Sequence, residues 1–322
     1  MSFSWFYSCL PQFETVISKI LFDAYARSQT DPSCLSTLDT VRAGILDENP
    51  QAEELNLKAS NGETINGLHF KGTENKAIIW LHGNGCFYET SYDKPLYWRE
   101  SLKRDEKIPH LLVFNPRGTG RSTGRTQLSF VIEDLSLMFK HLNCNSIVIG
   151  GHSMGGYFTL FGAAELQKQH PNIAINFISD RSIWDLKSRI SMKLEGAEYT
   201  GFSASLISIY IQFVISSPDW ARDSLEALES LKGRVLIIYH QKDGVVCMQD
   251  SIYEGLVKSK RAKEYDLLEL HNEDPNIGVE AYPHNRPFTE EENSIIITEI
   301  GKMLGIHDCP IMTPLLKSNL KV

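Results

Sequence analysis

The sequence lacks an excess of positive charge and lacks closely spaced cysteines. Its 322 residues carry a net charge of −8, and no basic stripe is present. Electrostatic binding to nucleic acid needs clustered Lys and Arg side chains, so we expect no nucleic-acid partner. The six cysteines are scattered without a Cys-x-x-Cys pair, which is typical of reduced thiols in a cytosol-like compartment and not of a disulfide framework.

Long apolar runs are missing as well. No run reaches the roughly 18 apolar residues of a membrane-spanning helix, so no transmembrane segment is expected. Residues 202–216 come nearest, but they contain Gln212 and predict a buried helix or an apolar lid. The N-terminal sequence lacks the positive start and unbroken apolar core of a signal peptide. These features predict a cytoplasmic protein, and they leave open a signal-independent export route and peripheral membrane contact.

Sequence motifs for cofactors and metals are also absent. There is no Gly-Lys-Ser/Thr of a nucleotide-binding loop and no His-Glu-x-x-His, and the ten histidines are dispersed. The stretch "GTGRSTG", 118–124, is a loose variant of a dinucleotide-binding loop. However, Pro116 and Arg117 separate it from the preceding strand, and the next strand ends in Gly150 and Gly151 without an acid. We therefore expect neither a cofactor nor a metal.

What the sequence does contain is a repeated alternation of apolar strands and helical segments. Residues 53–70 alternate around Asn61-Gly62 and predict a β-hairpin. Short, continuously apolar segments follow, and each stops at a polar or glycine-rich stretch: 76–82, 110–115, 146–151, 175–180, 233–243 and 264–271. Helical patterns separate or follow them near 128–142, after Ser153, and near 249–259 and 289–304. This order predicts an α/β fold with a mostly parallel sheet flanked by helices.

The chain divides into three predicted parts. Residues 1–50 form an N-terminal helical extension, 51–306 form the main domain, and 307–322 form a tail. Within the main domain, an insertion at about 181–230 is rich in aromatic and apolar residues. It predicts either a helical cap over the site or an ordinary packed helix pair, and a cap would favour an acyl or lipid-like substrate.

Ser153 is the candidate nucleophile. It lies in Gly-His-Ser-Met-Gly, between an apolar strand and a helix. This context is required for a nucleophile elbow, in which flanking glycines permit a sharp turn that exposes the serine hydroxyl.

A serine nucleophile needs a base, and the base needs an acid. Asp243 follows a strong strand and is the preferred acid, while Asp250 and Asp266 are weaker candidates. His284 lies in the loop before the last helix and is the preferred base, with His271 as the alternative. The remaining histidines near these motifs are interpreted as surface, structural or packing residues: His152, His240 and His307.

Two backbone N–H groups should stabilise the negative charge that develops on the substrate oxygen. Met154 directly follows the nucleophile and is expected to supply one. The loop "HGNG", 82–85, follows an earlier strand, and Asn84 is expected to supply the other.

Taken together, "WLHGNG", "FNPRGTGRSTG", "GGHSMGG", "HQKDGVV" and a late "PHN" resemble the α/β-hydrolase superfamily, in its esterase/lipase branch. The resemblance covers about 76–300. It implies a serine hydrolase without a cofactor that cleaves acyl compounds through an acyl-enzyme. Asn115 stands where the family usually has an aspartate. Asp180 and Arg181 resemble a segment that holds the loop beside the active site.

The resemblance predicts a carboxylic ester, acyl or lipid-like, as the substrate. The triad residues alone do not determine which leaving group is accepted, so a thioesterase or a peptidase remains an alternative. A catalytically inactive hydrolase fold used for binding is a second alternative, although none of the three catalytic residues is missing. Protein partners are not indicated by the sequence.

Overall fold

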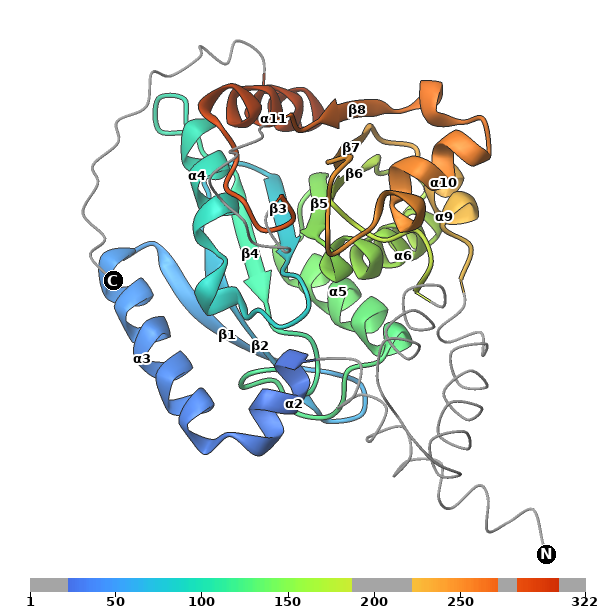
Figure 1. The fold of residues 1–322 in the computed structure, drawn as a ribbon. Coiled ribbons are helices and arrows are strands. Elements are labelled where there is room, and N and C mark those ends of the chain that lie inside the picture. Colours follow the sequence, from blue (N-terminus) through green and yellow to red (C-terminus); the bar gives the residue numbers. More distant parts are fainter. Residues whose placement is uncertain (1–22, 187–221, 272–282, 307–322) are drawn as a thin grey trace, which may run out of the picture.

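The structure is a computed structural model that describes residues 23–186, 222–271 and 283–306 (Figure 1). Most of the predicted cap, the predicted tail, His307 and the apolar run 202–216 lie outside the described residues. The division into domains therefore stays a prediction.

A single sheet of eight strands forms the centre of the molecule, in the order β1-β2-β4-β3-β5-β6-β7-β8. Strands β1 and β2 form the antiparallel hairpin, and β2 also pairs antiparallel with β4, whereas the remaining neighbours are parallel. The mostly parallel sheet is therefore confirmed. The strands are β1 (Ala52–Lys58), β2 (Thr64–Phe70), β3 (Lys76–Leu81), β4 (His110–Phe114), β5 (Ser146–His152), β6 (Ile175–Asp180), β7 (Val235–Tyr239) and β8 (Asp266–Glu269).

Helices cover both faces of the sheet (Figure 1). On one face lie α5 (Leu128–Leu142), α6 (Met154–Gln169), α9 (Ser224–Ser230) and α10 (Ile252–Lys258), and on the other lie α3 (Pro32–Glu48), α4 (Asp93–Ser101) and α11 (Glu290–Leu304). Helix α2 (Asp23–Thr30) precedes α3, so the described part of the N-terminal extension is helical, as predicted. Short 3₁₀ turns occur at Tyr88–Thr90, Met248–Asp250 and Ala262–Glu264.

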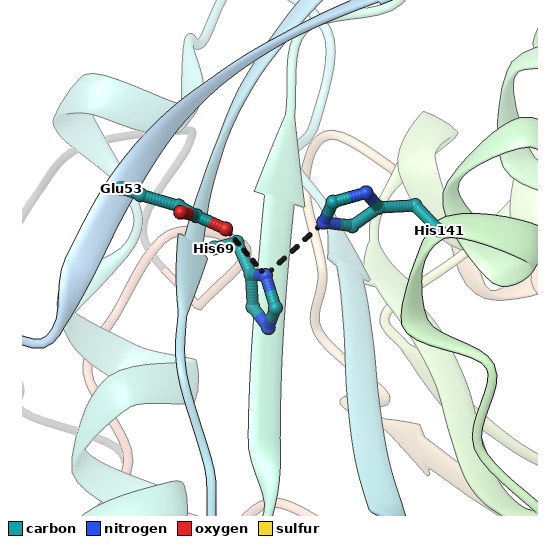
Figure 2. A group of neighbouring side chains, drawn as sticks. All are labelled: Glu53, His69 and His141. Carbon is teal, nitrogen blue, oxygen red and sulfur yellow. Dashed lines mark hydrogen bonds and ion pairs between the residues drawn. The ribbon is translucent and has the colours of Figure 1, made fainter.

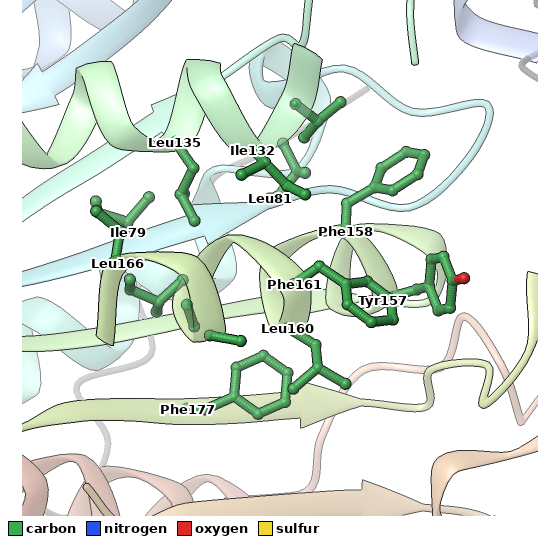
Figure 3. Packing of buried hydrophobic residues seen from close by; sticks show 14 of the residues in the cluster. Ile79, Leu81, Ile132, Leu135, Tyr157, Phe158, Leu160, Phe161, Leu166 and Phe177 are labelled. Atoms are coloured by element: carbon green, nitrogen blue, oxygen red, sulfur yellow. The ribbon is translucent and has the colours of Figure 1, made fainter. Parts of the chain in front are cut away.

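The alternation of side chains along each strand builds two cores. Ile79 and Leu81 of β3 and Phe177 of β6 contact the core beneath α5 and α6, which Figure 3 shows from close by. Their neighbours Ile78 and Ile178 point to the opposite core, beneath α4 and α11. Because successive strand residues face opposite sides, a strand buried on both faces is apolar throughout. The central strands are therefore recognisable in the sequence as short, continuously apolar segments.

Among the described residues, no helix has the length and apolar character that crossing a membrane requires.

Candidate active site

Ser153 occupies a sharp turn between β5 and α6. Its backbone has φ +54° and ψ −124°, in the left-handed half of conformational space that residues other than glycine rarely adopt. Such strain persists only where the surroundings enforce it, and it clusters at functional sites. The conformation is the one expected of a nucleophile elbow, at the carboxyl end of a central strand.

The glycines on either side of Ser153 are required by close backbone contacts. A Cβ atom on Gly151 would lie 2.5 Å from the carbonyl carbon of Gly155. A Cβ on Gly155 would lie 2.3 Å from the carbonyl oxygen of His82, at the end of β3. The elbow is therefore wedged between the neighbouring strand and the start of its own helix, and a side chain at either position would displace it.

His284 and Asp243 form a buried pair. Nδ1 of His284 lies 2.7 Å from Oδ2 of Asp243, and the two side chains are only 4% and 3% exposed. The other carboxylate oxygen of Asp243 accepts hydrogen bonds from the backbone N–H groups of Val245 and Val246, at 2.8 and 2.9 Å. These bonds fix the carboxylate in the turn that follows β7. Two residues 41 positions apart in the chain are thus brought together as the sequence predicts.

The loop that carries His284 is held on both sides. The Arg181 guanidinium donates hydrogen bonds to the carbonyl oxygens of Pro283 and Arg286, at 2.7 and 3.1 Å. Arg286 in turn pairs with Glu292, in the first turn of α11, through bonds of 2.8 and 2.6 Å. Arg181 therefore holds the loop beside the site, as the sequence resemblance implies.

The alternative acids and base lie elsewhere. The side chain of His271 is 77% exposed and lies 3.7 Å from Glu269. Asp266 is at the exposed start of β8, where it pairs with Arg234. Asp250 is buried in the 3₁₀ turn before α10, and His240 is buried at the end of β7. In the described part of the chain, the candidate base and acid that contact each other are His284 and Asp243.

His152 contacts the site, which the sequence did not indicate. Its ring centroid lies 4.7 Å from that of His284, and its Nδ1 donates to Oδ2 of Asp180 at 2.9 Å. Its Nε2 lies 3.4 Å from Oδ1 of Asn285, next to His284. His152 is therefore more than the packing residue that the sequence suggests, because its ring bridges the elbow and the loop that carries His284. Because this histidine directly precedes Ser153, it brings the serine and His284 into the same part of the molecule.

A buried cluster of charged side chains contacts His152. Asp180 is fully buried and pairs with Lys94 at 3.2 Å and with Arg181 at 2.7 Å. Burial opposes the charge on Asp180, but Arg181, Lys94 and His152 outweigh it and hold its pKa well below the usual range. Burial also lowers the pKa of His152 to about 4, helped by Arg181 and Lys94, so this imidazole is neutral at pH 7. Lys94 lies on α4, and no sequence motif marks it.

The loop after β3 approaches Ser153 closely. A Cβ on Gly83 would lie 3.3 Å from Cβ of Ser153, so only a small residue fits there. The loop contributes Asn84 to a small pocket that Met154 and Phe158 also line. Met154 begins α6, and the first N–H groups of a helix have no partner within that helix. The two residues predicted to stabilise an oxyanion therefore line one pocket beside the elbow.

Helix α2 supports this loop from the N-terminal side. The backbone N–H of Asp23 donates to the side-chain oxygen of Asn84 at 3.0 Å, and Arg27 donates to the carbonyl oxygen of Gly85. Ser28 accepts a 2.7 Å hydrogen bond from the N–H of Gly120, in the loop after β4. The N-terminal extension is thus built into the frame of the site.

Asn115, the departure from the family pattern, is fully buried in the same frame. Its side-chain oxygen lies 3.1 Å from Nε2 of His82 and accepts the N–H of Tyr88 at 3.0 Å. Its amide donates to Glu89 at 3.0 Å. A neutral amide can donate to a carboxylate, whereas an aspartate cannot. Asn115 therefore suits the buried Glu89 beside it.

A second cluster of ionisable side chains lies away from Ser153 (Figure 2). Glu53, His69 and His141 direct ligand atoms toward one another, and all of these atoms lie within 4.8 Å of one another. Among the described residues, this is the group whose side chains suit a metal ion. Burial and the adjacent His110 and His141 lower the pKa of His69 to about 4.

The chain resembles several proteins of known structure. No protein-family model and no curated protein sequence matches it. An α/β hydrolase from Vibrio vulnificus is 15% identical with a TM-score of 0.58, over 91% of this chain and 93% of that one. An esterase from Pyrococcus furiosus is 17% identical with a TM-score of 0.54, over 80% and 92% of the two chains. The α/β hydrolase GrgF from a Penicillium species is 16% identical with a TM-score of 0.52, over 79% and 99%.

These similarities establish the architecture: the chain has the α/β-hydrolase fold, as its sequence motifs predict.

Proposed function

We propose that the protein is a serine hydrolase that cleaves carboxylic esters through a Ser153–His284–Asp243 triad. The observation that carries this proposal is the buried 2.7 Å contact between His284 and Asp243. The ring of His284 lies 4.7 Å from that of His152, which directly precedes the serine held in a strained elbow. A carboxylate only accepts hydrogen bonds, so Nδ1 of His284 is the donor in this pair. The other ring nitrogen, Nε2, is then left without a proton and available as a base.

In the first half of the proposed reaction, the Ser153 hydroxyl oxygen attacks the ester carbonyl carbon while Nε2 of His284 takes the hydroxyl proton. Asp243 stabilises the imidazolium that forms. The N–H groups of Asn84 and Met154 stabilise the negative oxygen of the tetrahedral intermediate. The intermediate collapses to an acyl-enzyme, and the alcohol leaves with the proton from His284.

In the second half, a water molecule gives a proton to His284 and attacks the acyl carbonyl. The second intermediate collapses to the free acid, and His284 returns the proton to Ser153. No step needs a cofactor. A small-molecule acyl ester or lipid is the substrate class that we propose, and the names of two of the structural relatives, an esterase and a hydrolase, support it. A cytoplasmic location stays a prediction.

Labelling by a fluorophosphonate probe tests the nucleophile. We expect the wild type to be labelled and to hydrolyse p-nitrophenyl esters, and the Ser153→Ala variant to do neither. Equal labelling of both proteins would refute the role of Ser153. A wild type that is neither labelled nor active would favour the alternative of a hydrolase fold used for binding.

The same protein tests the alternatives within the fold. A series of p-nitrophenyl esters of increasing acyl length, run beside an acyl thioester and a peptide amide, ranks the leaving groups and the acyl preference by kcat/KM. We expect the oxygen esters to be the best substrates. A higher kcat/KM for the thioester or the amide would identify the protein as a thioesterase or a peptidase.

A further inference from the structure

The cluster of Glu53, His69 and His141 lies at the opposite edge of the sheet from Ser153. Glu53 is on β1 and His69 on β2, and His141 is in the last turn of α5, just before β5 begins at Ser146. Ser153 follows the far end of that same strand. Figure 2 shows the three side chains converging from three different elements. The cluster is therefore separate from the candidate active site.

Hydrogen bonds around His69 determine which of its ring nitrogens carries the proton. Nδ1 of His110 accepts a hydrogen bond from the backbone N–H of Gly72 at 3.1 Å, so this nitrogen has no proton of its own. Nε2 of His69 lies 2.7 Å from the same nitrogen. Because His110 is the acceptor, His69 must be the donor, and its proton is on Nε2. In the neutral form of the ring, which is the form that binds a metal, Nδ1 of His69 then carries a lone pair.

That lone pair faces a second acceptor. Nδ1 of His69 lies 3.3 Å from the carboxylate oxygen Oε1 of Glu53 and 3.2 Å from Nε2 of His141. A lone pair and a carboxylate oxygen facing each other at this distance repel, unless a cation lies between them. His141 can place one proton there as a hydrogen bond to His69, but that bond leaves the oxygen of Glu53 facing the lone pair of His69.

The spacing of these atoms fits a bound ion. Zn²⁺ binds imidazole nitrogen and carboxylate oxygen at about 2.0–2.2 Å with tetrahedral geometry, which puts neighbouring ligand atoms roughly 3.3–3.5 Å apart. Two of the three separations are 3.2 and 3.3 Å, and the third is within 4.8 Å. Glu53 is half-buried and His141 is exposed, so their side chains can rotate to shorten the third separation.

The surroundings resemble those that metal ligands need. A metal-binding histidine usually donates its other ring N–H to an acceptor that fixes its orientation. Here His110 does this for His69. The second oxygen of Glu53 is held by Lys71 at 2.6 Å, which leaves the first oxygen directed at His69.

We propose that Glu53, His69 and His141 bind a divalent transition-metal ion of the Zn²⁺ class, which links the edge hairpin β1–β2 to the end of α5. Two imidazoles and one carboxylate form the protein's part of a four-coordinate site, and the exposed side of the cluster leaves the fourth position to water. Glu53 and His69 face each other across the hairpin β1–β2 and His141 comes from α5, so no short sequence motif marks the site. The role of the ion is structural: it holds the edge of the sheet against α5 and takes no part in the chemistry at Ser153.

Binding of Zn²⁺ alone tests the proposal, with the full chain freed of metal by a chelator and titrated against a chromophoric competitor. We expect one Zn²⁺ per chain and a thermal unfolding temperature that rises on addition of Zn²⁺ but not of Mg²⁺. His141→Ala and Glu53→Gln should each weaken binding by at least tenfold. His110→Ala should weaken it by roughly ten- to a hundredfold through the orientation of His69. Co²⁺ in place of Zn²⁺ should give the visible absorption of a tetrahedral complex in the wild type only.

His271→Ala is the matched control, because it also removes an exposed histidine, from another part of the surface. It should bind Zn²⁺ as the wild type does. His141 is exposed, so its replacement leaves the fold intact, and unfolding in the presence of chelator checks this. Equal Zn²⁺ affinity of the wild type and His141→Ala would overturn the proposal, as would a wild type that does not bind Zn²⁺.

Discussion

Nδ1 of His284 donates a hydrogen bond to Oδ2 of Asp243 over 2.7 Å, and both side chains are almost completely buried. A buried carboxylate that is fully hydrogen-bonded holds an imidazole in one tautomer and one orientation. Replacing Asp243 with Asn keeps the shape but allows the wrong tautomer. We predict that Asp243→Asn lowers kcat on an ester substrate by on the order of 10⁴-fold.

His284 itself provides the matched test of the base. We predict that His284→Ala lowers kcat/KM by several orders of magnitude, whereas His271→Ala changes it little, because His271 is exposed and pairs with Glu269. Steady-state hydrolysis of a p-nitrophenyl ester measures both. If His271→Ala were the more damaging change, the base would have to be reassigned.

A further prediction concerns the close backbone contacts around the elbow. A methyl group at position 155 would meet the carbonyl oxygen of His82 at 2.3 Å, which is backbone and cannot rotate away. We predict that Gly155→Ala shifts Ser153 and lowers kcat by about 10²-fold, since a displacement of about 1 Å costs that much.

Gly44→Ala is its control. Gly44 lies within α3, and a Cβ added to it meets nothing within 4 Å. Alanine favours a helix over glycine by about 1 kcal/mol, so Gly44→Ala should raise the free energy of unfolding and leave kcat unchanged. Kinetics and urea unfolding of the two variants make the comparison; unaltered kinetics in Gly155→Ala would show that the elbow tolerates the shift.

Another prediction is a dependence of the free energy of unfolding on pH. Burial lowers the pKa of His82 from its usual 6.5 to about 4. The unfolded chain therefore binds a proton below pH 6.5 that the folded protein does not bind until about pH 4. The stabilisation that the neutral His82 contributes is fully present above pH 6.5 and is lost as the pH falls from 6.5 to 4. The loss from this one group is about 3 kcal/mol.

Urea unfolding at a series of pH values measures this effect. The free energy of unfolding of His82→Gln should depend less steeply on pH between 6.5 and 4 than that of the wild type, because glutamine does not titrate. His271→Ala, which removes an exposed histidine, should keep the slope of the wild type. Parallel curves for His82→Gln and the wild type would contradict the prediction.

The last prediction is that the side chains of Asn115 and Glu89 are energetically coupled. Asn115→Asp would place a carboxylate where an amide now donates to Glu89, and both positions are buried. We predict a loss of stability of about 1–3 kcal/mol. Adding Glu89→Gln should restore much of it, because the new amide can donate to the new carboxylate. A double-mutant cycle by urea unfolding measures the coupling energy, and additive effects would show that the two side chains act independently.

Much of the fold and the proposed triad follows from the sequence, for one physical reason. Strands buried on both faces are apolar throughout, so segments such as 76–82 and 175–180 are visible in the sequence. In a parallel sheet their carboxyl ends meet at one edge, so polar residues that follow them share a site. Asp243 and His284 could be paired on this basis.

Other features have no such signal. Helix α4 was not predicted, because Pro95 and several charged residues conceal its buried face, on which Trp98 is fully buried. Lys94 belongs to that helix, so its contact with Asp180 could not be foreseen. The cluster of Glu53, His69 and His141 depends on the pairing of an edge hairpin and on where α5 ends. The hairpin and the helix are each visible in the sequence, but the packing of the end of α5 against the hairpin is not encoded in a local pattern.

Helix α2 is made early in the synthesis of the chain, yet the groups that it bonds to are made much later. Asp23 bonds to Asn84 and Ser28 to Gly120, 61 and 92 residues further along the chain. Contacts of such long range form slowly. During translation α2 has no complete surface to pack on until residues near Gly120 have left the ribosome. Helix α2 can therefore dock only after the loops that it supports have been made, and the loop that carries Asn84 gains its support from α2 at that point.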